Sequence, residues 1–428
     1  MLPPGPTSPR PVQTLAWITR PGPWLLRLRA RYGDAIHVRI ANEGSWILLS
    51  DPDAIKQVFT GDPDALHAGE ANVILRPLLG PRSVLLLDEA PHMTQRKLLL
   101  PAFHGERMQA YGRLIADIAE REVAGWPVGT PLAMRPRMQA LTLEVIMRAV
   151  FGSRDERLRT ALAAMLDWTT DPKRLALVAT LGPRRVERWR LFRGVLDPVD
   201  ELLAGEIAAR RARPGEDMLS VLATSGMGDA ELHDELLTLL VAGHETTATA
   251  LAWALERLAR HPDAWSRMDD ESYRDAVIKE TLRLRPVLPI VLRRLVRPLE
   301  IGGWELPAGV SVAPCIYLVH RREDVYPNPY AFRPERFLES PPETYSWLPF
   351  GGGMRRCIGA SFAVLEMSTI LRTVAREMRL EPAGGGPELI SRRAIVFAPS
   401  RGGEVLVSSA GGRQVAQDVE PVLQADRP

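Results

Sequence analysis

FGGGMRRCIGASFAVLEM, residues 350–367, is the stretch of sequence that decides the fold. It begins as a glycine-rich loop around Cys357 and continues as a helix, because apolar residues recur at helical spacing from about Ile358. Backbone N–H groups at the start of a helix are unpaired and partly positive, so they favour a thiolate and lower the pKa of a cysteine. The glycines that let this backbone turn tightly and approach a flat ligand closely are Gly351, Gly352, Gly353 and Gly359.

This loop resembles the haem-binding loop of the cytochrome P450 superfamily, because it matches the pattern F-x-x-G-x-R-x-C-x-G at every fixed position. The resemblance implies haem b (iron protoporphyrin IX), with Cys357 binding the iron, Phe350 beside the sulfur and Arg355 at a haem propionate. A thiolate ligand donates electron density to haem iron and favours cleavage of the O–O bond. The alternative is an inert buried cysteine after a chance glycine loop. Cys315, in APCIYLV, has no such setting and is expected to lie in the core.

Helical periodicity dominates residues 88–285, and the longest helix is expected from residue 229 to about 262. It is apolar around most of its circumference, so it should run through the core and could line a cavity. Within it, AGHETT resembles the family's oxygen-activation segment, which implies that Ala242 lies at the haem and that Thr246, with Glu245 behind it, relays protons. A zinc motif is excluded, because HExxH would need histidine where Ala248 stands. A helix kink without catalytic purpose is the alternative.

Two further patterns resemble the same family. Glu280 and Arg283 in ETLR match its E-x-x-R pair, and Arg336 in AFRPERF is the expected third member of a structural network. Alone, such a pair at i, i+3 usually lies on the surface and contributes little to stability. The residues expected to hold the haem propionates are His92 and Arg96, four apart on one helical face, and Arg293, with Arg294 as the alternative to Arg293.

Strand patterns flank the helical region at both ends of the chain. Alternating residues predict a hairpin over 36–49, and further strands are expected around residues 293–313 and 394–409. The predicted fold class is therefore mainly α with small β-sheets (α+β). The resemblance implies the two-lobed cytochrome P450 fold, with haem between the long central helix and the cysteine-bearing helix. Residues 1–23, rich in proline and glycine, are expected to form an irregular arm, and 24–428 a single domain.

Composition excludes several classes of protein. The net charge of +2, from 54 basic and 52 acidic side chains, gives no broad attraction to nucleic acid. There is no signal peptide pattern and no apolar run of membrane-spanning length, so we expect a cytoplasmic monomer without a membrane anchor. Two cysteines cannot build a disulfide framework or a four-cysteine zinc site.

The resemblance implies a monooxygenase that hydroxylates or epoxidises an apolar small molecule with O2 and two electrons. Because no G-x-G-x-x-G or G-K-S/T motif occurs, the electrons should come from an external ferredoxin or flavodoxin with its reductase. A basic surface near Lys97, Arg107 and Arg356 is the expected docking site. Alternatives are a peroxide-driven haem-thiolate peroxygenase and a non-catalytic haem sensor, but the acid–threonine pair disfavours both. Substrate contacts are expected from Leu239, Leu288, Ile290, Val291 and Phe397.

Overall fold

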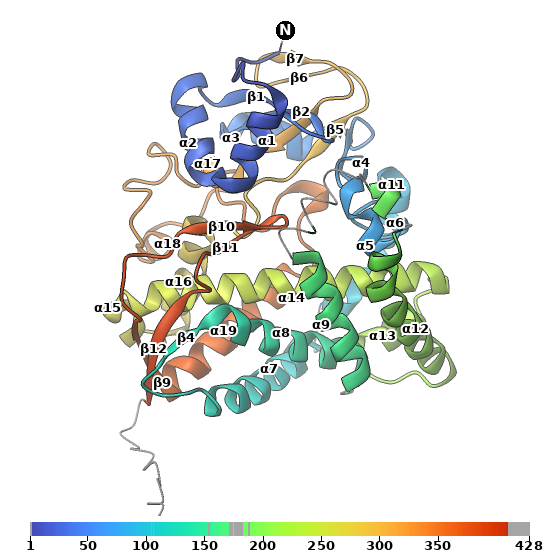
Figure 1. The fold of residues 1–428 in the computed structure, drawn as a ribbon, viewed down its shortest axis with the longest axis vertical. Coiled ribbons are helices and arrows are strands. Elements are labelled where there is room, and N and C mark those ends of the chain that lie inside the picture. Colours follow the sequence, from blue (N-terminus) through green and yellow to red (C-terminus); the bar gives the residue numbers. More distant parts are fainter. Residues whose placement is uncertain are drawn as a thin grey trace, which may run out of the picture.

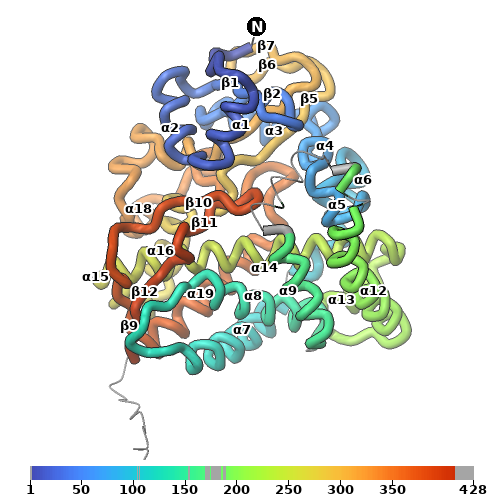
Figure 2. The backbone as a smooth tube through the Cα atoms, in the orientation of Figure 1, coloured from blue at the N-terminus to red at the C-terminus, as the bar shows by residue number. Residues whose placement is uncertain are grey.

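The fold consists of a small lobe rich in strands above a larger helical lobe (Figure 1), as seen in a computed structural model of the chain. The structure describes residues 2–409 apart from 104, 106, 153–154, 171–173, 175–182 and 187–188. The smooth backbone trace shows α14 crossing the whole helical lobe, with the β10–β11 hairpin lying between the two lobes (Figure 2). Mainly helical architecture with small sheets is therefore confirmed.

Eighteen helices and three short 3-10 segments make up most of the described chain. The helices are α1 (Arg10–Thr19), α2 (Pro21–Tyr32), α3 (Pro52–Thr60), α4 (Ala68–Ala71), α5 (Arg76–Leu79), α6 (Glu89–Leu99), α7 (Arg107–Ala124), α8 (Met134–Phe151), α9 (Glu156–Thr170), α11 (Pro183–Val186), α12 (Arg190–Ala212), α13 (Met218–Ala223), α14 (Asp229–Ala259), α15 (Pro262–Ser266), α16 (Glu271–Leu284), α17 (Ile316–Val319), α18 (Arg336–Glu339) and α19 (Ala360–Glu377). The 3-10 segments are η1 (Val73–Leu75), η2 (Leu100–Phe103) and η3 (Gly353–Arg355).

The long helix α14 is the axis of the helical lobe and packs against α8, α12, α16 and α19. It has 31 residues, close to the length that its apolar pattern predicts. At its start, the Glu231 side chain accepts a hydrogen bond from the Gly228 N–H at 3.0 Å, which satisfies one of the free donors there. Further along, Trp253 is fully buried and its indole N–H donates to the Phe397 carbonyl at 2.9 Å. This bond ties the helix to the C-terminal strands.

The strands form one five-stranded sheet in the order β1-β2-β8-β5-β3, a three-stranded sheet in the order β4-β12-β9, and two hairpins. Their bounds are β1 (Ala35–Ile40), β2 (Gly44–Leu49), β3 (Leu66–His67), β4 (Pro131–Ala133), β5 (Arg293–Leu295), β6 (Leu299–Ile301), β7 (Trp304–Leu306), β8 (Ser311–Pro314), β9 (Met378–Pro382), β10 (Ile390–Arg393), β11 (Val396–Pro399) and β12 (Glu404–Ser409). The predicted hairpin is confirmed as β1–β2, with Ile36, Val38 and Ile40 facing the core. The parallel pairing of β2 with β8 joins the N-terminal hairpin to a strand from the last third of the chain.

The N-terminal segment differs from the expected irregular arm. Helix α1 already begins at Arg10, and α2 begins at Pro21. Prolines open both helices, where their fixed φ suits the first turn and no N–H is needed. Trp17 is 4% exposed and packs on Trp46 and Phe397, which fixes α1 on the body of the protein. Proline therefore marks helix starts here, and the prediction of an irregular arm over 1–23 is wrong from Arg10 onward.

Within the residues that the structure describes, no helix is both long enough and apolar enough to cross a membrane.

Candidate active site

The cysteine loop is built from backbone conformations that glycine permits. Gly351 and Gly353 adopt φ of +67° and +62°, and the Cys357 N–H donates to the Phe350 carbonyl at 2.9 Å, closing the loop. A Cβ on Gly353 would lie 2.1 Å from the carbonyl oxygen of Phe59, so the loop touches the backbone of α3. Helix α19 begins at Ala360, two residues later than Ile358, because the loop uses the intervening residues to turn.

The two cysteines lie in opposite environments. Cys315 is fully buried, as expected for a core residue, whereas Cys357 is accessible. Burial by surrounding protein raises the pKa of the Cys357 thiol, while the Gly359 N–H, Arg96 and Arg356 lower it. The net direction is upward, so the prediction of a lowered pKa is wrong for the polypeptide itself. One N–H and two arginines do not outweigh desolvation, and a bound cation is needed to favour the thiolate fully.

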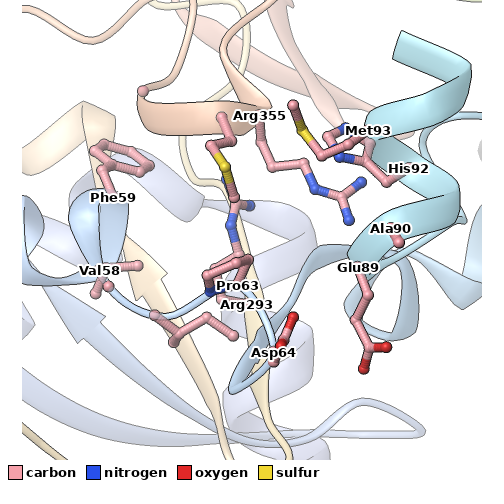
Figure 3. A pocket seen from close by; sticks show the side chains of 14 residues that line it. Val58, Phe59, Pro63, Asp64, Glu89, Ala90, His92, Met93, Arg293 and Arg355 are labelled. Carbon is pink, nitrogen blue, oxygen red and sulfur yellow. The ribbon is translucent and has the colours of Figure 1, made fainter. Parts of the chain in front are cut away.

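A cavity of about 190 Å³ lies beside the loop, between α3, α6 and β5 (Figure 3). Its wall contains His92, Arg293 and Arg355, three of the predicted propionate-binding residues. Strand β5 alternates its side chains, so Arg293 lines this cavity, while Arg294 lines a different pocket. The structure therefore favours Arg293 over Arg294 for this role.

The arginines of this cavity lie in its inner wall, whereas its acidic residues lie on the exposed rim. Burial, then Arg355 and Arg96, lower the pKa of His92 to about 4, so the imidazole is neutral near pH 7. Burial and the neighbouring Arg355 lower the pKa of Arg293 to about 10. Asp88 pairs with Arg355 at 2.6 Å. The acids on the cavity rim, Asp64 and Glu89, are exposed. A buried arginine, Arg293, beside the Arg355–Asp88 pair is a cation that an anionic group with carboxylates would neutralise.

On α14, Ala242 and Thr246 lie four residues apart on one side of the helix. Ala242 is accessible although it lies midway along this core helix, and the Thr246 hydroxyl donates to its carbonyl at 2.7 Å. Glu245 points elsewhere: its two oxygens accept from Arg135 and Gln139 of α8, each at 2.6 Å. Among the described residues, no hydrogen bond joins Glu245 to Thr246. The predicted pair is thus adjacent in sequence but divided between two faces.

Gly243 and His244 complete the contact between α14 and α8. A Cβ on Gly243 would lie 3.3 Å from Ile146, so glycine allows the two helices to approach closely, and α14 stays unbroken there. His244 is buried, and its Nδ1 shares a 2.9 Å hydrogen bond with the Thr142 hydroxyl. Burial lowers the pKa of His244 to about 4, which makes it a neutral core histidine.

Comparison with known proteins identifies the family. The cytochrome P450 family model matches residues 3–407. This chain belongs to the cytochrome P450 family. Cytochrome P450 135B1 of Mycobacterium tuberculosis is 39% identical, with 99% of this chain and 94% of the relative covered. Cytochrome P450 138 of Mycobacterium bovis is 37% identical, covering 95% of this chain and 96% of the relative.

A solved structure shows the same fold. Retinoic acid-bound cyanobacterial CYP120A1 superposes with a TM-score of 0.83, covering 95% of this chain and 99% of that chain at 24% sequence identity. The predicted cytochrome P450 fold is confirmed. As a P450, the protein binds haem, which supplies the activation of O2 at iron for monooxygenation.

The residues of this P450 fit that cofactor. The Cys357 sulfur would bind the iron, and the cavity wall offers His92, Arg293 and Arg355 to the propionates. Arg96, from the same helix as His92, interacts electrostatically with Cys357 and lies on the cysteine side of the cluster. Arg355 now donates to Asp88 and to the carbonyls of Val84 and Leu87, so it already organises the loop before α6.

The predicted structural network of the P450 is present and fully buried. Arg283 donates to both oxygens of Glu280 at 2.7 and 2.9 Å, and Arg336 donates to Glu280 at 3.2 Å. Arg283 also donates to the carbonyls of His320 and Pro329, each at 2.8 Å. These bonds fix the backbone that leads into the cysteine loop.

Sequence reasoning missed His320, which lies beside this network. Its Nε2 accepts from the Leu348 N–H at 2.8 Å, so its Nδ1–H donates to the Arg283 carbonyl at 3.1 Å. Burial holds the pKa of His320 well below its usual value. It also missed Asp88, Arg135 and Gln139, because their side-chain partners Arg355 and Glu245 lie more than 100 residues away and leave no local pattern.

The predicted substrate residues do not form one group. Leu239 and Leu288 are half-buried beside the main core of the helical lobe, and Val291 packs against the core under the five-stranded sheet. Ile290 packs with the N-terminal core cluster. Phe397 is 1% exposed and packs between Trp17 and Tyr317 in that cluster. Phe397 is thus a core residue in this structure, and its role as a substrate contact stays a prediction.

Proposed function

We propose that this P450 hydroxylates or epoxidises an apolar small molecule, using O2 and two electrons delivered by a separate ferredoxin or flavodoxin in the cytoplasm. The observation that carries the proposal is the arrangement on α14. An accessible Ala242 and a half-buried Thr246 share one side of a core helix, and a carboxylate is anchored directly behind them. A haem sensor would need Cys357 but no such acid and hydroxyl.

Thr246 is the proton-relay residue that lies nearest to the site of the reaction. Its hydroxyl hydrogen is engaged with the Ala242 carbonyl at 2.7 Å, which leaves its oxygen lone pairs directed outward as an acceptor. Glu245 supplies the acid behind it. Because Arg135 and Gln139 hold both of its oxygens, Glu245 must leave at least one of these partners to pass a proton toward Thr246.

The substitution Thr246→Ala tests this role. The reduced electron carrier should still be consumed. A smaller share of its electrons should be used to form product, and a larger share should be lost as peroxide or water. Thr247→Ala is the matched control, because Thr247 is the buried neighbour whose hydroxyl lies 3.3 Å from the Gly243 carbonyl. Unchanged coupling in Thr246→Ala would remove the relay. Turnover with hydrogen peroxide at the full rate, without any electron carrier, would instead support a peroxygenase.

Thiolate ligation is tested by the carbon monoxide complex of the reduced protein. We expect the red-shifted Soret band of a thiolate ligand, lost in Cys357→Ser and kept in Cys315→Ser, since Cys315 is a core residue. A histidine-type spectrum in the wild type would contradict the assignment of Cys357.

The basic surface near the cysteine is the proposed docking site for the electron carrier. Arg356 lies in the loop directly before Cys357 and is exposed, and Lys97 is exposed on α6, which also carries Arg96. Arg107, at the start of α7, is half-buried. Lys97→Glu with Arg356→Glu should slow reduction by an acidic carrier at low salt, because steering depends on charge. Arg20→Glu, on α2's N-terminal side, is the control and should leave the rate unchanged.

A further inference from the structure

Helix α1 exposes a row of large apolar side chains. Val12, Leu15 and Ile18 are 53%, 61% and 43% exposed, and their spacing of three places them on one side of the helix. The opposite side, with Gln13 and Trp17, is buried against the protein. Single exposed apolar residues are ordinary, but three in a row on one helix mark a contact surface.

The exposure of this row is held in place by the fold. Gln13 accepts from the Arg39 N–H at 2.8 Å, and its amide donates to the Ser8 carbonyl at 2.7 Å. The Thr14 hydroxyl accepts from the Ala41 N–H at 2.9 Å. Because α1 is bonded to β1 and its following turn on one side, it presents its other side outward as a fixed surface.

The same part of the chain is basic throughout. Residues 1–33 contain no aspartate or glutamate and contain five arginines. Arg10 and Arg20 flank α1 and are exposed, as are Arg27 and Arg31 on α2. An apolar row between exposed arginines is the composition of helices that lie on membrane surfaces.

A pocket continues this surface toward η1. A cavity of about 480 Å³ is lined by Arg10 of α1 and by Val73, which is 45% exposed. Arg294 lies in the same wall, together with Glu43 and Glu70. Figure 1 shows α1 and α2 on the outside of the small lobe, at the end of the molecule away from α7. A flat partner can therefore reach α1 without meeting the helical lobe.

We propose that α1 and α2 bind the surface of a membrane that contains anionic phospholipids. Val12, Leu15 and Ile18 would enter the boundary between headgroups and acyl chains, and the flanking arginines would contact phosphates. A second copy of this chain could also cover the apolar row, but the charges around the row disfavour such a dimer. Two copies meeting through α1 would bring the arginines of both against each other without an acid from residues 1–33 to neutralise them.

Vesicle sedimentation tests the proposal with the full-length protein. Wild type should pellet with vesicles of phosphatidylcholine mixed with phosphatidylglycerol at low salt, and much less with phosphatidylcholine alone or at high salt. Leu15→Glu with Ile18→Glu should lower the partition coefficient at least about tenfold. Arg20→Gln with Arg27→Gln should lower it about 25-fold, because each charge contributes a factor of about five.

The matched control is Leu338→Glu, which changes a side chain that is 46% exposed on α18 and should bind vesicles like wild type. Thermal unfolding of each variant confirms that it is folded. Failure of wild type to pellet with the anionic vesicles overturns the proposal, as does equal binding by the Leu15 and Ile18 variant. A wild-type dimer in light scattering that this variant dissociates would assign the surface to a second copy instead. None of these readouts depends on catalysis.

Discussion

Two buried clusters of cations in this P450 differ in how they are neutralised. Around Glu280, Arg283 and Arg336 share one fully buried carboxylate and also donate to backbone carbonyls, so most of their hydrogen-bonding groups are satisfied within the protein. Around the cavity, Arg293 is buried beside the neutral His92, and the nearby Asp88 is already engaged by Arg355. The first cluster holds the fold together. The second has spare positive charge for a ligand, so burial of arginine alone does not distinguish structure from function.

The largest expected effect on stability comes from a substitution in the cluster around Glu280. Glu280→Gln leaves two buried guanidinium groups without a carboxylate, so it should lower the free energy of unfolding by about 3–5 kcal/mol. Chemical denaturation of the haem-free protein measures this. Glu339→Gln is the control, because Glu339 forms an exposed pair with Arg333 and should change stability by less than about 0.5 kcal/mol. A loss below about 1 kcal/mol in Glu280→Gln would show that the cluster is not structural.

The cysteine loop connects the two clusters along the chain, because the Glu280 network precedes it and its Arg355 lines the cavity. Substitutions of its glycines test how the loop is held. Gly353→Ala forces a side chain into a positive φ and against the Phe59 carbonyl, so it should destabilise the protein by about 2–3 kcal/mol. In Gly359→Ala, the nearest atom is a Phe103 ring carbon at 3.8 Å, an ordinary contact, and the change should be small. Equal effects in thermal unfolding would contradict the contact between the loop and α3.

The pH dependence of stability probes the cavity. In the folded haem-free protein, burial and neighbouring arginines lower the pKa of His92 to about 4, whereas the unfolded chain binds this proton near pH 6.5. The unfolded state is therefore protonated first, and stability falls as pH decreases from about 6.5 toward 4.

Between pH 8 and pH 5, wild type should lose about 2 kcal/mol more stability than His92→Gln, because the variant lacks this titration. Denaturation of both proteins at the two pH values gives the difference. If the two lost the same amount, His92 would not be held in a cationic environment.

The smallest effect on the free energy of unfolding is expected for Arg293→Leu. This substitution should instead weaken the retention of haem. Removing one charge-assisted bond to a propionate should speed haem transfer to an acceptor apoprotein about tenfold. Stability of the haem-free form should stay within about 1 kcal/mol, because the substitution also relieves repulsion from Arg355. Arg294→Leu is the neighbouring control that leaves transfer unchanged. Equal rates of haem transfer in the two variants would show that Arg293 does not bind the haem in the way that sets its cluster apart from the Glu280 cluster.

The sequence was sufficient where local spacing determines geometry. Glu280 and Arg283 share a face of α16 at i, i+3, and Ile36, Val38 and Ile40 alternate along β1, as predicted. It was not sufficient where partners are distant. Nothing near Glu245 indicates that Arg135 and Gln139 will hold it, and Arg293 and Arg294 are indistinguishable until β5 assigns them to opposite faces.

Proline misled the prediction at the N-terminus. Clusters of proline usually indicate irregular chain, but Pro11 and Pro21 lie in the first turns of α1 and α2, where proline is favourable. The decisive factor is tertiary: Trp17 and Gln13 of α1 are buried against the sheet and its turns. Sequence periodicity over ten residues is too short to reveal this.

The parallel pairing of β2 with β8 can form only late in the synthesis of the chain. Trp46 can pair with Ser311 only after roughly 260 further residues have been translated, which takes tens of seconds at roughly 5–20 residues per second. During that interval β2 has an unpaired edge and α1 lacks part of its supporting sheet. A nascent chain stalled before residue 311 therefore exposes its apolar N-terminal segments, and it is the form of this protein that most needs a chaperone.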